Sequence, residues 1–155
     1  MLKRVIVVFI VFLSIVRADT DLKKAVFDLT TSDLTTFESR VIKGVAFNKA
    51  HYESKFQELD IIVVIHGGAY KFFVKDLTKT KYKNDKKILS ASKEIEQRLT
   101  SLIKTYNVKF QVCGVGLKKN EIDEENIYNF VEVIPSAMVG LIDAQSSGYA
   151  YIPVD

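Results

Sequence analysis

Cysteine is almost absent from this chain. Its 155 residues contain one cysteine, Cys113, with two histidines, two prolines and no tryptophan. A single thiol excludes an internal disulfide framework, a CxxC redox pair and a cysteine-rich zinc site. The two histidines, His51 and His66, lack the spacing of metal ligands. The sequence therefore predicts no metal site.

Several common catalytic motifs are also missing. Gly114-Val115-Gly116 resembles the start of a dinucleotide-binding GxGxxG, but Lys119 stands where the third glycine belongs. The sequence contains no GxSxG, Walker A or HExxH motif. These absences exclude the usual nucleophile elbow, phosphate loop and zinc-protease helix. We therefore expect no cofactor.

The first residues have the pattern of an export signal. A basic start at Lys3 and Arg4 precedes an apolar stretch of about a dozen residues, and Ala18 ends a small-residue cleavage pattern. A membrane-spanning helix needs about 20 residues. We therefore expect cleavage of residues 1–18, a periplasmic or secreted protein, and no stable membrane insertion afterwards.

Net charge gives no argument for a nucleic-acid partner. The chain has 22 basic and 19 acidic residues, and removal of Lys3, Arg4 and Arg17 with the signal leaves 19 of each. A near-neutral protein lacks the electrostatic signature of nucleic-acid binding. The remaining residues, 19–155, suit a single domain with one hydrophobic core.

Two kinds of apolar pattern alternate along residues 19–155. Short runs rich in β-branched residues predict strands, and apolar residues three or four apart predict helices. The expected strands are 25–29, 60–68, 108–114, 131–137 and 149–154. The expected helices are 32–55, with Ser32 as N-cap, 88–106, 123–128 and 137–147. This alternation predicts an α/β fold, a flavodoxin-like three-layer α/β/α sandwich with a mainly parallel sheet of about five strands.

Two residues that can carry chemistry end predicted strands and are followed by glycine. His66 precedes Gly67 and Gly68, and Cys113 precedes Gly114. Ligands of open parallel sheets bind beyond the carboxyl ends of the strands. Both residues are therefore candidates for a functional site, with His66 orienting a substrate or exchanging a proton. His51, among charged neighbours in a predicted helix, is expected at the surface.

The role of Cys113 has two interpretations. Backbone N–H groups of the turn from Gly114 to Gly116, and a short helix beginning near Asp123, place partial positive charge near the sulfur and favour the nucleophilic thiolate. Cysteines buried on strands are, however, common and usually inert. The residue pattern alone leaves both interpretations open.

Three segments carry a resemblance to a known family. They are DIIVVIHGGAYKFF, VKFQVCGVGLKKNEI and VEVIPSAMVGLIDAQSSGYAYIPV, in this order. The chain is similar, from about Lys24 onward, to the DsrE/DsrF-like (YchN-like) sulfur-relay family. This resemblance implies a five-stranded flavodoxin-like sheet and symmetric homotrimers or homohexamers. It also implies a cysteine that accepts sulfane sulfur as a persulfide, here Cys113, and a His-Gly segment that maps to His66 and Gly67.

The leading hypothesis is an exported sulfur carrier or sulfurtransferase that holds sulfane sulfur as a persulfide on Cys113. Its partners would be a donor or acceptor protein or a small sulfane-sulfur compound, bound beside the backbone turns at Gly67, Gly68, Gly114 and Gly116. The alternative is a noncatalytic oligomeric module that binds a small molecule or protein and has a structural cysteine. A third possibility is redox sensing through a disulfide between subunits.

A lysine-rich segment also has two interpretations. Residues 75–87 contain six lysines and two aspartates, and their polarity predicts a loop. The loop is either a solvated connection or a cationic flap near a site for an anionic sulfur compound.

Overall fold

The computed structural model describes residues 22–155, so the signal peptide predicted for residues 1–18 lies outside the described part. Five strands form the sheet: β1 Lys23–Leu29, β2 Leu59–Ile65, β3 Lys109–Cys113, β4 Val131–Ile134 and β5 Ala150–Val154. The helical segments are α1 Leu34–Phe37, η1 Glu38–Lys43, α2 Gly44–Glu53, η2 Ala69–Phe72, η3 Leu77–Lys79, α3 Lys86–Tyr106, α4 Gly114–Lys119, η4 Glu124–Asn126 and α5 Ala137–Ser146. Within residues 22–155, no helix has the length and apolar character to cross a membrane.

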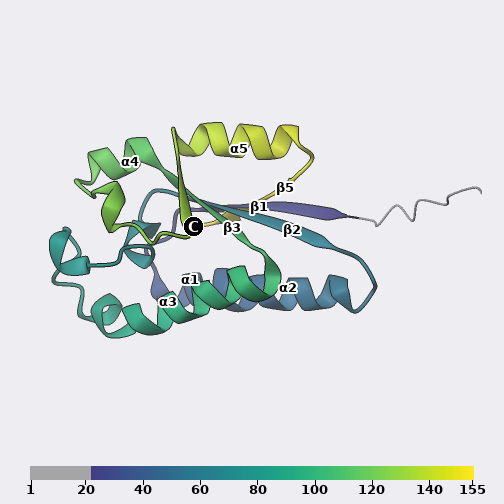
Figure 1. The fold of residues 1–155 in the computed structure, drawn as a ribbon, viewed down its shortest axis with the longest axis horizontal. Helices are drawn as coiled ribbons and strands as arrows, with labels where there is room; N and C mark the ends of the chain where they lie inside the picture. The colour runs from purple at the N-terminus through teal and green to yellow at the C-terminus, as the bar shows by residue number, and fades with distance from the viewer. Residues whose placement is uncertain (1–21) are drawn as a thin grey trace, which may run out of the picture.

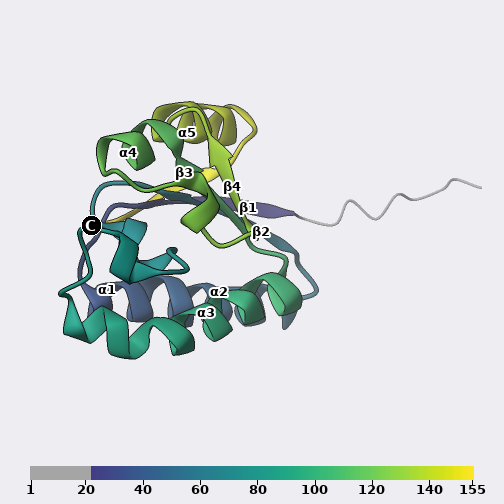
Figure 2. The same ribbon diagram turned by 60° about the vertical axis from the view of Figure 1, so that its left-hand side comes forward.

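The sheet is entirely parallel, with strand order β4-β3-β2-β1-β5. Helices α1, α2 and α3 lie on one side of it, and α4 and α5 lie on the other (Figures 1 and 2). We call these the α3 face and the α5 face. The predicted flavodoxin-like α/β/α sandwich of about five strands is therefore confirmed.

The strand order also shows where the sheet stops growing on one side and starts growing on the other. From β1 to β4 each new strand is added on the same side, whereas β5 returns to pair with β1 on the other side. The strand order therefore changes direction between β1 and β5, which lie side by side in the sheet. In open α/β sheets this switch point is where ligands bind.

The hydrophobic core lies mainly on the α3 face. One cluster of 29 buried residues fills this face and also takes in Leu117 of α4. It includes a stacked pair of rings, Phe37 and Phe72, with centroids 4.1 Å apart. The α5 face has a separate cluster of six buried residues, among them Cys113. Because burial of apolar area is the main stabilising term, the α3 face contributes most to stability.

Two local predictions about helices are wrong in detail. Asp33, not Ser32, caps the first helix, because its carboxylate accepts the Thr36 N–H at 2.7 Å. The helix expected over 123–128 is only the 3-10 turn η4. The helix that follows β3 is instead α4, which begins at Gly114, directly after Cys113.

Candidate functional site

Cys113 is both the last residue of β3 and the N-cap of α4. Its Sγ accepts the backbone N–H of Gly116 at 3.4 Å, in the way that a serine or aspartate caps a helix. The residue is 8 % exposed and packs among apolar neighbours on the α5 face. The thiol is therefore buried, and a backbone N–H points at its sulfur.

Gly116 allows a tyrosine to approach the start of α4. A Cβ at this position would lie 1.6 Å from the hydroxyl oxygen of Tyr70, so only glycine fits without movement. Tyr70 is buried, and its hydroxyl donates to the carbonyl oxygen of Cys113 at 3.5 Å. Burial raises the pKa of Tyr70, which keeps the phenol protonated as a donor. Tyr70 therefore helps to hold the backbone of Cys113 in place.

His66 follows β2 and makes a close contact with a carboxylate of β1. Its Nε2 lies 2.5 Å from Oδ1 of Asp28, and both side chains are partly buried. An ionised carboxylate can only accept hydrogen bonds, so Nε2 carries the hydrogen in this contact. Nδ1 is then the ring nitrogen that is available to accept a proton.

The second oxygen of Asp28 is bound by a residue of β5. The hydroxyl of Tyr151 donates to Oδ2 of Asp28 at 2.5 Å, and this hydrogen bond is the main cause of the raised pKa of Tyr151. Both carboxylate oxygens of Asp28 therefore have a hydrogen-bond partner. A partly buried carboxylate needs such partners because burial removes water that would otherwise bind it. Strands β1 and β5 and the residue after β2 contribute to this group, which we call the Asp28 triad (Asp28, His66 and Tyr151).

The Asp28 triad lies at the switch point of the sheet. Asp28 is the next-to-last residue of β1, and Tyr151 belongs to β5, the strand that pairs with β1 on its other side. New strands are added on one side of β1 up to β4, and β5 is added on its other side. The position of the triad therefore matches the place where open α/β sheets bind ligands.

His66 and Cys113 lie at the same level on neighbouring strands. The last pair of the β2–β3 ladder is Ile65 with Val112, and one further step of the same register brings His66 opposite Cys113. Among the described residues, no hydrogen bond or ion pair joins the two side chains. The strand order thus brings the two predicted site residues to one edge, as neighbours without a direct bond.

The glycines expected to bind a substrate differ in their surroundings. Gly67 has a φ of +62°, which favours glycine, and it turns the chain sharply after His66. The N–H of Gly68 donates to the carbonyl of Thr30 at 2.8 Å, so it is not available to bind a substrate. Gly114 packs against the carbonyl of Ile134. Of the four glycines, Gly116 is the one whose N–H is seen to face the sulfur.

Sequence reasoning missed Asp28 and Tyr151. A signal for Asp28 existed, because it is the one charged residue in the apolar run AVFDL and must find partners when the strand is buried. Tyr151 has no such local signal, since its contact with Asp28 spans 123 residues of sequence. Within residues 22–155, no three His, Cys, Asp or Glu side chains gather as a metal-binding group would require.

Comparison with known proteins agrees with this architecture. A solved structure of a protein of unknown function, MTH1491 from Methanobacterium thermoautotrophicum, matches with a TM-score of 0.59 and 21 % identity, covering 84 % of this chain and 98 % of that one. An uncharacterized protein of Aquifex aeolicus (strain VF5) is 27 % identical over 132 residues. That match covers 84 % of this chain and 55 % of the relative, so the chain spans about half the length of that protein.

A family model supplies the more specific match. The model of the DsrE/DsrF-like family, which is associated with sulfur relay, matches residues 24–154. This range includes all five strands almost completely and every residue of the Asp28 triad, as well as Cys113. The chain therefore belongs to the DsrE/DsrF-like family.

Proposed function

We propose that this protein carries or transfers sulfane sulfur as a persulfide on Cys113. The observation that supports this most directly is the position of the thiol at the end of β3, where its Sγ accepts the Gly116 N–H at the start of α4. A hydrogen-bond donor aimed at the sulfur can stabilise the negative charge that the sulfur carries during the transfer. The same donor can stabilise the anionic persulfide after the transfer.

The proposed reaction has two steps that balance. The Cys113 thiolate attacks the outer sulfur of a donor such as thiosulfate; a new S–S bond forms, the donor S–S bond breaks, and sulfite leaves with the bonding electron pair. An acceptor thiolate then attacks the outer sulfur of the Cys113 persulfide, and the Cys113 thiolate leaves. No external oxidant or reductant is required in either step.

The Asp28 triad would accept the proton that the Cys113 thiol loses. With Nε2 bound to Asp28, the Nδ1 of His66 can accept a proton as Cys113 ionises. Asp28 would hold the ring in this tautomer, and Tyr151 would hold Asp28. This assigns proton transfer to His66 and a positioning role to Asp28 and Tyr151.

Intact-mass measurement after incubation with polysulfide or thiosulfate tests the proposal. We expect a gain of about 32 Da, the mass of one sulfur atom, on the wild-type protein and none on Cys113→Ser. His66→Ala should slow the gain, and His51→Ala is the matched control because His51 is exposed on α2. A wild-type protein that never gains this mass contradicts the proposal.

A second function remains in competition: a noncatalytic oligomeric binding module in which Cys113 is structural. The observation that favours it is the low exposure of Cys113, 8 %, inside an apolar cluster that includes Val64 and Ile134. The two functions predict different reactivity towards a thiol reagent such as N-ethylmaleimide. Modification of Cys113 only after denaturation supports the structural role, whereas modification of the native protein supports sulfur transfer.

We also propose that the protein forms a homotrimer or homohexamer through the α5 face. Large apolar side chains are exposed there on α4, α5 and β5: Val115, Met138, Ile142 and Tyr151. Such patches commonly mark interfaces between proteins. Light scattering coupled to size exclusion should show an assembly that Ile142→Glu dissociates, while Phe47→Glu, an exposed position on α2, leaves it intact.

The compartment follows from the proposed signal of residues 1–18. We propose that this segment directs export and is removed, so that sulfur transfer takes place in the periplasm or outside the cell. Cell fractionation with intact-mass analysis tests this. Recovery of a cytosolic protein that retains residues 1–18 contradicts it.

A further inference from the structure

A hollow lined by lysines lies away from the Asp28 triad. It has a volume of about 440 Å³ and is formed by η3 with the residues that follow it and by the end of α4 with the two residues that follow it. We call it the lysine hollow; its lining residues are Thr78, Lys79, Thr80, Lys81, Lys83, Lys119, Asn120 and Glu121. A volume of this size is sufficient for a small-molecule ligand.

The lysine hollow has a strong excess of positive charge. Four of its eight lining residues are lysines and one, Glu121, is acidic. Lys79 reaches Asp76 at 3.7 Å, and Lys81 donates to the side-chain oxygen of Asn120 at 2.5 Å. Among the described residues, neither the side chain of Lys83 nor that of Lys119 has a hydrogen-bond or ion-pair partner. The positive potential of the hollow is therefore largely uncompensated.

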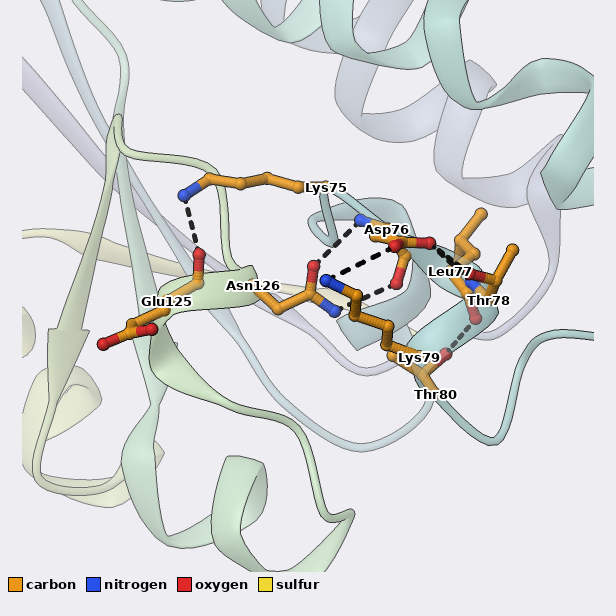
Figure 3. A network of polar contacts seen from close by, with 8 residues as sticks. All are labelled: Lys75, Asp76, Leu77, Thr78, Lys79, Thr80, Glu125 and Asn126. Carbon is orange, nitrogen blue, oxygen red and sulfur yellow. Dashed lines mark hydrogen bonds and ion pairs between the residues drawn. The ribbon is translucent and has the colours of Figure 1, made fainter.

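The loop that forms one wall of the hollow is held in place by a second segment. The side chain of Asn126 brackets Asp76, accepting its backbone N–H and donating to its carbonyl, both at 2.9 Å (Figure 3). The Asp76 carboxylate in turn accepts the backbone N–H of Thr78 at 3.0 Å. Lys75 adds a bond to the carbonyl of Glu125 at 2.7 Å.

Buried side chains anchor the same loop from below. Leu77 is in the hydrophobic core, and Thr80 is buried with its hydroxyl donating to the carbonyl of Leu77 at 2.8 Å. The predicted polar loop is therefore an ordered support for lysines on its outer side. Lysines on an ordered support lose less entropy when they bind a ligand than lysines on a flexible one.

We propose that the lysine hollow binds a small polyvalent oxyanion of the phosphate or sulfur-oxyanion class. Lysines from two segments converge on one concavity, and a compact anion with several charged oxygens can contact both walls at once. α4 has six residues and is about 9 Å long. Because Cys113 precedes α4 and Lys119 ends it, this site is separate from the thiol and does not depend on sulfur transfer.

Isothermal titration in a low-salt, phosphate-free buffer tests the site with two probes, inorganic pyrophosphate and thiosulfate. Every protein compared, including the one called wild type in this test, carries Cys113→Ser, so that thiosulfate cannot react with the thiol. We expect saturable 1:1 binding of at least one probe, which weakens as salt is added. The double variant Lys83→Gln/Lys119→Gln should bind about tenfold more weakly. The matched control is Lys93→Gln/Lys104→Gln, which removes the same charge from exposed positions of α3 and should bind as the wild type does.

A substitution at Glu121 should change anion binding in the opposite direction, towards tighter binding. Glu121→Gln removes the acidic side chain from the lining and should tighten binding severalfold. The choice of probe separates the two sources of anion, because preferential binding of pyrophosphate indicates a phosphate ligand and preferential binding of thiosulfate a sulfur oxyanion. The proposal is overturned if neither probe saturates, or if the double variant, shown to be folded by circular dichroism, binds as tightly as the wild type.

Discussion

The two faces of the sheet differ in what they bury. The α3 face is covered by α1, α2 and α3 and holds most of a cluster of 29 buried residues, including several packed aromatic rings. The α5 face buries six residues and carries the Asp28 triad and Cys113 near its carboxyl edge. Most of the buried apolar area, and thus most of the stability, is in the layer on the α3 face. The polar groups of the candidate site lie on the α5 face, where fewer buried apolar residues surround them.

Matched leucine truncations should show this difference most clearly. Leu99 in α3 is fully buried, whereas Leu141 in α5 is only partly buried. Leu99→Ala should lower the free energy of unfolding by about 2–5 kcal/mol, because it leaves a cavity. Leu141→Ala should cost about 1–2 kcal/mol, since it removes less buried area. Urea denaturation measures both, and equal losses would show that the two layers contribute alike.

The boundary between the faces can be disturbed at Gly116. A Cβ there displaces the buried Tyr70, so Gly116→Ala should cost about 1–3 kcal/mol through overpacking. It should also change the rate at which Cys113 reacts with a thiol reagent, since the N–H of Gly116 binds Sγ. Val115→Ala, one residue earlier and exposed, is the control. A Gly116→Ala protein with wild-type stability would mean that Tyr70 is not held as described.

Helix caps provide a smaller contrast between the faces. Asp85 caps α3 and also bonds Lys71 at 3.0 Å, whereas Ser136 caps α5 alone. Each truncation to alanine should cost about 1 kcal/mol, and Asp85→Ala should cost more because it also removes the ion pair. Thermal unfolding at neutral pH measures both, and a larger loss for Ser136→Ala would contradict this order.

The Asp85 effect should depend on pH. The hydrogen bond from Lys71 lowers the pKa of Asp85 below its ordinary value of about 3.9. A lowered pKa contributes stability that is present above the unfolded-state pKa and is lost as pH falls through the folded-state pKa. The difference between wild type and Asp85→Ala should therefore shrink below about pH 4. A difference that stays constant down to pH 2 would show that the charge of Asp85 is not involved.

The smallest change in stability is expected at Asp28 itself. Asn is isosteric with Asp, so Asp28→Asn can keep contacts to His66 and Tyr151 while it removes the charge. We expect little change in the free energy of unfolding. Cys113 should react more slowly with polysulfide, and the dependence of that rate on pH should change. A variant that is unstable but reacts at the wild-type rate would assign Asp28 to the fold and not to the chemistry.

Periodicity predicted the strands well because their apolar runs are local and continuous. The run from Ile61 to Ile65 is such a case, and it forms β2. Helix starts were harder to predict: the short helix expected near Asp123 forms instead at Gly114, where a sulfur atom acts as the cap. Two glycines in its first turn made this segment resemble a turn, since glycine is a poor helix former.

The candidate site was predicted only in part, for a topological reason. His66 and Cys113 were found because both end strands, but their adjacency depends on the pairing of β2 with β3, which no local pattern specifies. Asp28 and Tyr151 meet across 123 residues of sequence. Contacts of that kind depend on the strand order of the whole sheet.

The return of β5 to β1 also has a consequence for the order of events during synthesis. A nascent chain that has reached only α5 contains Cys113, His66 and Asp28, but β1 still has an open edge and the carboxylate of Asp28 lacks its phenol partner. Domains begin to fold during translation from the amino terminus. The triad is therefore completed only after Tyr151 has been synthesised, so chains released before that point lack it.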